Sequence, residues 1–230
     1  GGWLTVSGVT LACTLFAWPL LKPVRNATAV KRVPKLSREA FRAIGLLGIA
    51  YILFGISSVP HAIFLSAYLH VKLHLSPAHA AMAFASFGVG VGIGGPVLSS
   101  VLAQYAGLRI AAVVSTLIGG TAITMVLLTD NITLVICSGA LMGMAQMGLV
   151  PIGSNCCIEI AGPAGHTRWW SVLSAGFTSG VIVGTLAIGA LFQAGFGYID
   201  GFWMAAAMSV LSIVFCIAFA LLPRLKPASE

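Results

Sequence analysis

Charged side chains are scarce in this chain, and acidic ones are the scarcest. Only 7% of the 230 residues are Asp, Glu, Lys or Arg, and Asp and Glu together number five. About a quarter of the residues of a soluble domain are charged. Hydrophobic residues make up 59% of the sequence, and mean hydropathy is +1.03. These values exclude an ordinary water-soluble domain and predict a protein whose main solvent is lipid.

Several chemical motifs are missing as well. The five cysteines form no C-x-x-C pair, and the sequence holds neither a G-x-x-x-x-G-K-[ST] phosphate loop nor a G-x-S-x-G nucleophile elbow. Gly90-x-Gly92-x-x-Gly95 matches a dinucleotide fingerprint, but no strand is predicted before it and it lies inside an apolar stretch. We therefore expect neither an enzyme nor an ATP-driven pump, and no cofactor.

Seven stretches are long and apolar enough to cross a bilayer. A span needs about 20 mostly apolar residues to cross roughly 30 Å of hydrocarbon, and only a helix satisfies its backbone within one segment. The predicted spans are residues 2–21, 43–69, 78–105, 108–128, 132–160, 169–194 and 199–222. The predicted fold class is all-α: a polytopic membrane protein with a leading helix at 1–21 and a six-helix bundle at 43–222.

Positive charge falls in every second gap between these spans. Seven of the twelve Lys and Arg residues lie in a basic linker, residues 22–42. If the chain crosses seven times, Arg109, Arg168 and the tail at 223–230 fall on the linker's side, and only Lys72 falls opposite. Basic residues collect on the cytoplasmic side, so we expect the N-terminus outside and the C-terminus in the cytoplasm of a bacterial inner membrane. The same pattern argues against nucleic acid as the partner of the basic residues.

The gaps after the linker are short. Helices joined by such turns are expected to pack as consecutive antiparallel neighbours. Within the linker, Ser37 can cap a short helix from Arg38 to Arg42 that leads into the second span.

Three segments resemble parts of the major facilitator superfamily (MFS). Ala62-Ile63-Phe64-Leu65-Ser66-Ala67-Tyr68-Leu69, followed by His74-Leu75-Ser76, resembles the opening helix and outer loop of a family half. Ser100-Val101-Leu102-Ala103-Gln104-Tyr105-Ala106-Gly107-Leu108-Arg109 is similar to the family loop G-x-L-A-D-R-x-G-R-R, with Gln and Tyr in place of Asp and Arg. Glu159, Pro163 and Arg168, followed by Leu173-Ser174-Ala175-Gly176-Phe177, resemble the junction of family helices 10 and 11.

Residues 43–222 thus resemble the C-terminal half of an MFS transporter, and the first span and linker resemble the last N-terminal helix and the central loop. Ala50-Tyr51-Ile52-Leu53-Phe54-Gly55 and Pro60 are similar to the YbfB-like bacterial branch. The resemblance implies secondary transport of a small solute by alternating access, coupled to a proton or ion gradient. It also implies that 43–69 and 132–160 line the cavity, while 78–105 and 169–194 form gates.

A transporter of this kind needs two bundles. The second would come from a missing N-terminal half, from a partner chain or from a second copy. One alternative function is a non-transporting MFS-like subunit that scaffolds or assembles a larger membrane complex, which the lack of charge within the spans favours.

Candidate residues for the solute or proton pathway are polar groups within the spans. His61 is one, because imidazole changes charge near neutral pH; it can equally be a neutral histidine bonded to a neighbouring helix. Gln146 is another, because a primary amide in hydrocarbon needs partners, and the family arrangement puts it at the depth of His61. Pro60 is expected to kink the helix and free carbonyl groups. The remaining candidates are Tyr51, Ser57, Ser58 and Asn155.

Glycines recur within the third and sixth spans. Gly88 and Gly92 lie in the third, and Gly176, Gly180 and Gly184 lie four residues apart in the sixth. This spacing places small residues on one helix face, where a neighbouring backbone can approach closely. The face serves either static packing or the gating movement of bundles that rock.

A charge cluster is expected at the cytoplasmic ends of the helices. Glu159 and Arg168, with Arg109 as a further member, are predicted to form an ion-pair cluster that is made in one transport state and broken in another. A solvated pair of little energetic value is the alternative.

Soft metal ligands give a third possible function, copper import. Met204 and Met208 stand four residues apart, and His79 lies three residues before Met82. Thioether and imidazole suit Cu(I), but methionine is also ordinary filler in apolar helices. We therefore expect no metal.

Overall fold

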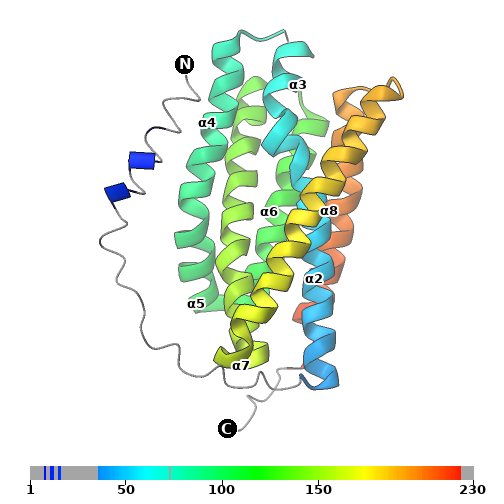
Figure 1. Ribbon diagram of the computed structural model, residues 1–230. Coiled ribbons are helices and arrows are strands. Elements are labelled where there is room, and N and C mark those ends of the chain that lie inside the picture. The colour runs from blue at the N-terminus through cyan, green and yellow to red at the C-terminus, as the bar shows by residue number, and fades with distance from the viewer. Residues whose placement is uncertain (1–7, 9–10, 13–14, 17–35, 73, 224–230) are drawn as a thin grey trace. The chain divides into compact units, whose positions relative to one another are not determined.

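A computed structural model describes residues 8, 11–12, 15–16, 36–72 and 74–223 (Figure 1). The chain divides into two compact units, Gly1–Val33 and Pro34–Glu230. In the first unit the described residues are helical. The rest of the predicted leading helix, linker residues 22–35 and tail residues 224–230 lie outside the described residues.

Within the second unit every described element is a helix. The elements are α2 (Arg38–Val59), η2 (Pro60–Phe64), α3 (Leu65–Val71), α4 (Pro77–Gly94), η3 (Gly95–Leu102), α5 (Ala103–Ala106), α6 (Leu108–Leu128), α7 (Ile132–Gln193) and α8 (Tyr198–Ala220). The first three run on as one rod, and so do the next three, which gives five helices long and apolar enough to cross a membrane. The all-α polytopic class is confirmed.

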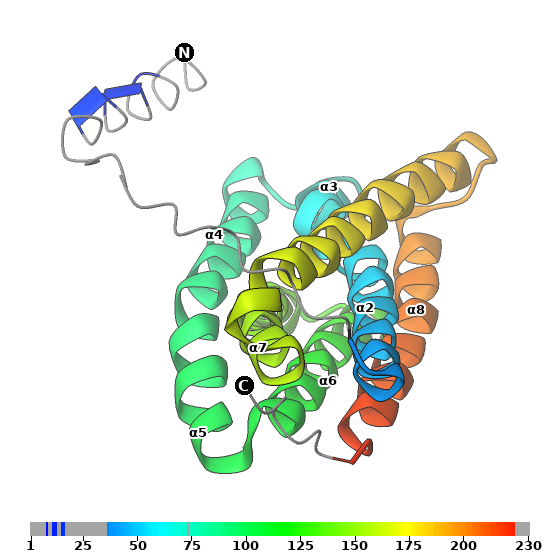
Figure 2. The ribbon, with the colours of Figure 1, turned by 60° about the horizontal axis from the view of Figure 1, so that its bottom comes forward.

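The long helix α7 is folded into two arms at Gly162. This residue has φ 70° and ψ 171°, a conformation that glycine adopts without steric cost, and Pro163 suits the first turn of a new helix. Figures 1 and 2 show the chain reversing direction here, so that the first arm (residues 132–161) and the second arm (residues 163–193) run opposite ways. Each arm exceeds the about 20 residues that a span needs. The gap predicted between the spans 132–160 and 169–194 is too long, because one glycine makes the turn.

Side-chain caps mark where the helices begin. The Ser37 hydroxyl accepts a hydrogen bond from the backbone N–H of Ala40 at 3.1 Å, which confirms the predicted cap. The helix that it starts does not end at Arg42 but continues as α2 into the second predicted span. Ser76 and Asn131 cap α4 and α7 in the same way, since each accepts from a backbone N–H that has no partner within the helix.

Two proline residues coincide with stretches of π-helix. Pro60 begins η2, and Pro96 is the second residue of η3. Proline removes a backbone donor and crowds the preceding turn, and a wider π turn absorbs that disruption without ending the helix. At Pro60, where the sequence predicts a kink, the structure has a π-helical stretch in a helix that continues to Lys72. The π-helical stretch at Pro96 was not predicted.

Glycine allows α4 to lie directly against the first arm of α7. A Cβ added to Gly90 would lie 2.9 Å from Cα of Ala140, and one added to Gly94 would lie 2.9 Å from Cα of Met144. No described atom lies within 4 Å of a Cβ placed on Gly88 or Gly92. The glycines of α4 that pack closely are therefore Gly90 and Gly94. They lie on roughly the opposite side of the helix from the predicted Gly88 and Gly92.

The second arm of α7 uses glycine in the same way against α2. Gly180 packs directly against the backbone of Ile52. A Cβ on Gly184 would lie 3.0 Å from Cα of Ile56. A Cβ on Gly176 would lie 3.2 Å from the Ile52 side chain. The four-residue spacing thus lies along one helix contact.

The arginines of the described part gather at one end of the bundle. The ring of Phe41, beside Arg42, lies 6.1 Å from the ring of Trp169, beside Arg168. Lys72 follows the opposite end of the same rod. The start of α2 and the bend of α7 therefore share one end, as the charge pattern predicts.

Candidate functional site

A cavity of about 200 Å³ lies where α2 meets the two diverging arms of α7. Tyr51 comes from α2, Gln146 from the first arm, and Trp170, Phe177 and Thr178 from the second arm. The cavity thus joins one rod and two arms that are far apart in sequence. None of its lining residues carries a formal charge.

Tyr51 holds the α2 side of the cavity against the first arm. Its side chain is buried, and its hydroxyl donates to the backbone carbonyl of Leu149. A Cβ on Gly153 would collide with that hydroxyl, so the absence of a side chain there leaves room for the phenol. Tyr51 is therefore a fixed wall whose donor is already used.

Gln146 differs from Tyr51 because part of its amide has no partner. Among the described residues, no donor lies within hydrogen-bond distance of its Oε1, and that atom is buried. A buried polar group without a partner costs about 1–3 kcal/mol. Gln146 is thus a lining residue with a buried polar atom that has no partner among the described residues.

His61 does not share this cavity. Its ring is 1% exposed, and Nε2 lies 3.1 Å from the Ser138 hydroxyl, which donates to the carbonyl of Val135 at 2.7 Å. Nε2 therefore donates to Ser138. The ring also packs edge-on against Phe202, with the centroids 5.2 Å apart.

His61 and Gln146 are not at the same depth, contrary to the expectation from the family arrangement. The partner of His61, Ser138, precedes Gln146 by eight residues, which is about 12 Å along a helix. The residue of this rod that lies beside Gln146 is Tyr51 of α2, whereas His61 lies farther along the rod, in η2. The two leading candidates thus belong to different places.

The three remaining predicted pathway residues also lie outside the cavity. Ser57 and Ser58 are buried, and each hydroxyl donates at 2.9 Å to a carbonyl of its own helix, that of Phe54 and Gly55 respectively. Asn155 lies on an exposed face of the first arm. None of these three lines the cavity.

We expect His61→Ala to lower the free energy of unfolding by about 2 kcal/mol, because it removes a packed ring and leaves Ser138 short of a donor. Ser138→Ala, which keeps the ring, should cost about 1 kcal/mol. Thermal unfolding of the purified protein in detergent measures both. If neither variant is less stable, the packing role fails and a pathway role for His61 regains support.

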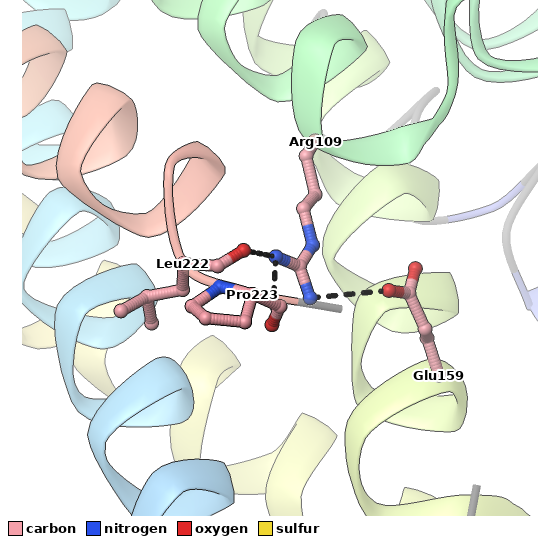
Figure 3. A network of polar contacts seen from close by, with 4 residues as sticks. All are labelled: Arg109, Glu159, Leu222 and Pro223. Atoms are coloured by element: carbon pink, nitrogen blue, oxygen red, sulfur yellow. Dashed lines mark hydrogen bonds and ion pairs between the residues drawn. The ribbon is translucent and has the colours of Figure 1, made fainter. Parts of the chain in front are cut away.

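A second polar cluster lies at the arginine-rich end (Figure 3). Arg109, at the start of α6, is 8% exposed. Its Nη2 lies 3.3 Å from Oε1 of Glu159, and Nη1 donates to the Leu222 carbonyl, with the Pro223 carbonyl at 3.5 Å. The guanidinium also lies over the ring of Phe219, 5.3 Å from its centroid. One side chain thus connects α6, the first arm of α7 and the end of α8.

The expected pairing of Glu159 with Arg168 is not formed. Both residues are described, and the guanidinium of Arg168 lies 5.5 Å from the Trp169 ring centroid instead. Arg168 follows the turn at Gly162 and so belongs to the second arm, whereas Glu159 belongs to the first. The cluster therefore contains Arg109 and Glu159 without Arg168.

The weak metal candidates His79, Met82, Met204 and Met208 lie on α4 and α8. No group of three His, Cys, Asp or Glu residues there is placed to hold an ion. Nδ1 of His79 lies 2.9 Å from the Ser76 hydroxyl, and Met82 is 54% exposed. Met204 and Met208 are half-buried on α8.

The sequence reasoning missed the wall that the second arm supplies. Trp170, Ser174, Phe177 and Thr178 are spaced i, i+4, i+7 and i+8, which is one face of a helix. It also missed His166, whose Nε2 lies 2.8 Å from the Ser154 hydroxyl across the bend. The helix-face spacing was the available signal for the wall.

Comparison with known proteins gives one family match. The model of a family described as the uncharacterised MFS-type transporter YbfB matches residues 1–217. A search of curated proteins finds no match to the chain. The match extends over every element that forms the cavity.

Proposed function

The chain belongs to the YbfB-type family of MFS transporters, and from this premise we propose that it carries a small solute across the membrane by alternating access. Membership places it in the bilayer as a transport protein. The proposed energy source is a proton or other ion gradient, in keeping with the sequence, which contains no phosphate loop.

One observation supports this cavity, rather than another part of the bundle, as the solute site. The cavity at Tyr51 and Gln146 is formed by α2 and the two arms of α7, and uncharged side chains line it, three of them aromatic. Ligand sites are typically apolar hollows with a few polar groups. We therefore assign solute contact to Tyr51 and Gln146, and packing roles to His61, Ser57 and Ser58.

In this proposal the cavity is half of a site. A second bundle, supplied by preceding sequence, a partner chain or a second copy, closes it from the other side, and rocking between the bundles exposes it alternately. The arginine-rich end faces the cytoplasm of an inner membrane, because basic residues concentrate there.

Cysteine labelling tests alternating access without knowledge of the solute. In a background whose native cysteines are replaced, Gln146→Cys is treated with a membrane-impermeant maleimide in right-side-out and in inside-out vesicles. We expect labelling in both, since an alternating site opens to each side in turn. Gln193→Cys, an exposed glutamine at the end of α7, is the matched control and should label from one side.

The non-transporting subunit makes the opposite prediction. A sealed Gln146→Cys that labels from neither side, or from one side alone, would remove the support for transport and favour that alternative. Labelling of the control from both sides would show leaky vesicles, and the measurement would be repeated with intact ones.

A further inference from the structure

Two neighbouring helices carry an exposed arginine at the same end of the bundle. Arg42 lies in the second turn of α2, and Arg168 lies in the second turn of the second arm of α7. The ring of Phe41 meets the ring of Trp169 edge-on, with the centroids 6.1 Å apart, so each arginine follows or precedes a residue of the helix contact. Both helices begin at this end (Figure 1), and the positive ends of their dipoles therefore add to the two charges.

The two arginines lie on the side of this contact that is away from the solute cavity. On the second arm, Arg168 and the cavity residue Trp170 stand about 100° to either side of the contact residue between them. On α2, Arg42 stands about 100° to one side of its contact residue, and the cavity residue Tyr51 stands about 80° to the other. Because the two cavity residues face one cavity, the two arginines share the opposite side.

Acidic side chains leave these arginines without a counter-ion in the described structure. The one ion pair among the described residues joins Arg109 to Glu159. Glu39, in the first turn of α2, is exposed and lies in no such pair, and residues 1–38 contain no Asp or Glu. The Trp169 ring orients the guanidinium of Arg168 without neutralising it. The open charge therefore favours an anion.

Toward the middle of each helix the same side becomes apolar. On α2, Gly45 and Ile49 follow Arg42 at i+3 and i+7, and on the second arm Val172 follows Arg168 at i+4. Ile49 is 41% exposed and Val172 is 50% exposed, and no described atom lies within 4 Å of a Cβ placed on Gly45. A pair of cations above an apolar surface matches a phospholipid, whose phosphate lies at the membrane surface and whose acyl chains lie deeper. A soluble anion would use the cations alone.

We propose that this arginine face, formed by Arg42, Gly45, Ile49, Arg168 and Val172, binds an anionic phospholipid of the adjacent leaflet. The phosphate lies at the two arginines, since a planar guanidinium suits phosphate oxygens, and an acyl chain lies over the two exposed aliphatic side chains. In the proposed transporter the second bundle closes the cavity on the other side and leaves this face to lipid. The lipid site requires only that the chain lies in a bilayer, so it stands or falls separately from alternating access.

Native mass spectrometry of the purified full chain in detergent tests the site. The protein is stripped of lipid and equilibrated with equal amounts of phosphatidylglycerol and phosphatidylcholine that have the same acyl chains, and the adducts of each are counted. We expect phosphatidylglycerol to be preferred. Arg42→Gln and Arg168→Gln should each lower that preference about fivefold, which corresponds to about 1 kcal/mol for one arginine at an anionic lipid surface.

Lys72→Gln is the charge-matched control. It removes one positive charge from an exposed residue at the opposite end of the rod, so the preference for phosphatidylglycerol should remain that of the wild type. Binding of phosphatidylcholine should be unchanged in all three variants, which shows that they are folded. Glycerol 3-phosphate, a soluble headgroup without acyl chains, should not displace the lipid.

Equal binding of the two lipids by the wild type would overturn the proposal. So would an equal loss of preference in Lys72→Gln and Arg168→Gln, because the effect would then come from net charge and not from this face. Displacement by glycerol 3-phosphate would identify a soluble anion as the ligand. Binding of a hexaglutamate peptide that depends on Arg168, without any lipid preference, would identify an acidic protein segment as the occupant instead.

Discussion

Gly90→Ala is expected to lower the free energy of unfolding by about 3 kcal/mol, the upper part of the range for overpacked interiors. The added methyl group would lie 2.9 Å from Cα of Ala140, and neither backbone can move without separating α4 from the first arm of α7. In a bilayer such close helix contacts are a main source of association, since lipid tails are as apolar as the side chains. Detergent-induced unfolding followed by circular dichroism measures the change.

Gly88→Ala provides the matched control on the same helix. No described atom lies within 4 Å of the new methyl group, and alanine is favoured over glycine within a helix by up to about 1 kcal/mol. Its stability should equal or slightly exceed that of the wild type. Equal losses in the two variants would mean that α4 is rotated relative to the arrangement described above.

Arg109→Ala is expected to cost about 3 kcal/mol, because removing one partner of a buried polar network leaves the others unsatisfied. The Leu222 carbonyl would lose its donor, Glu159 its counter-ion and Phe219 the guanidinium over its ring. The end of α8 should loosen first. Hydrogen exchange at the last turn of α8, together with thermal unfolding, measures both effects.

Glu159→Gln separates the ion pair from the rest of this network. The Glu159 side chain is 36% exposed, so solvent screens the pair and we expect a loss of less than about 1 kcal/mol. A loss as large as that of Arg109→Ala would show that the ion pair, rather than the carbonyl contacts, holds the end of α8 in place.

The assignment of some polar residues to packing and of Gln146 to solute contact has a physical basis. Buried hydroxyls such as Ser57 and Ser58 donate to their own helix, and such groups need nothing from a solute. Gln146 has more hydrogen-bonding capacity than its surroundings satisfy. Gln146 lines the cavity, whereas Ser57 and Ser58 do not, and for this reason we assign solute contact to Gln146.

The sequence by itself determined the helical class, the approximate position of each described rod, and the collection of described arginines at one end. These properties are local, or they follow because successive spans cross the membrane in alternating directions. A bilayer requires about 20 apolar residues per span and a backbone whose hydrogen bonds are made within the span. The cap at Ser37 is local in the same sense.

Only the tertiary structure decided which face of each helix meets which neighbour. Gly90 rather than Gly88 packs against Ala140, Tyr51 rather than His61 lies near Gln146, and Arg109 rather than Arg168 pairs with Glu159. Each choice depends on the rotation and the axial position of a rod that is apolar nearly all round. Hydrophobic periodicity cannot supply either one, because they are set by contacts between residues that lie far apart in the chain.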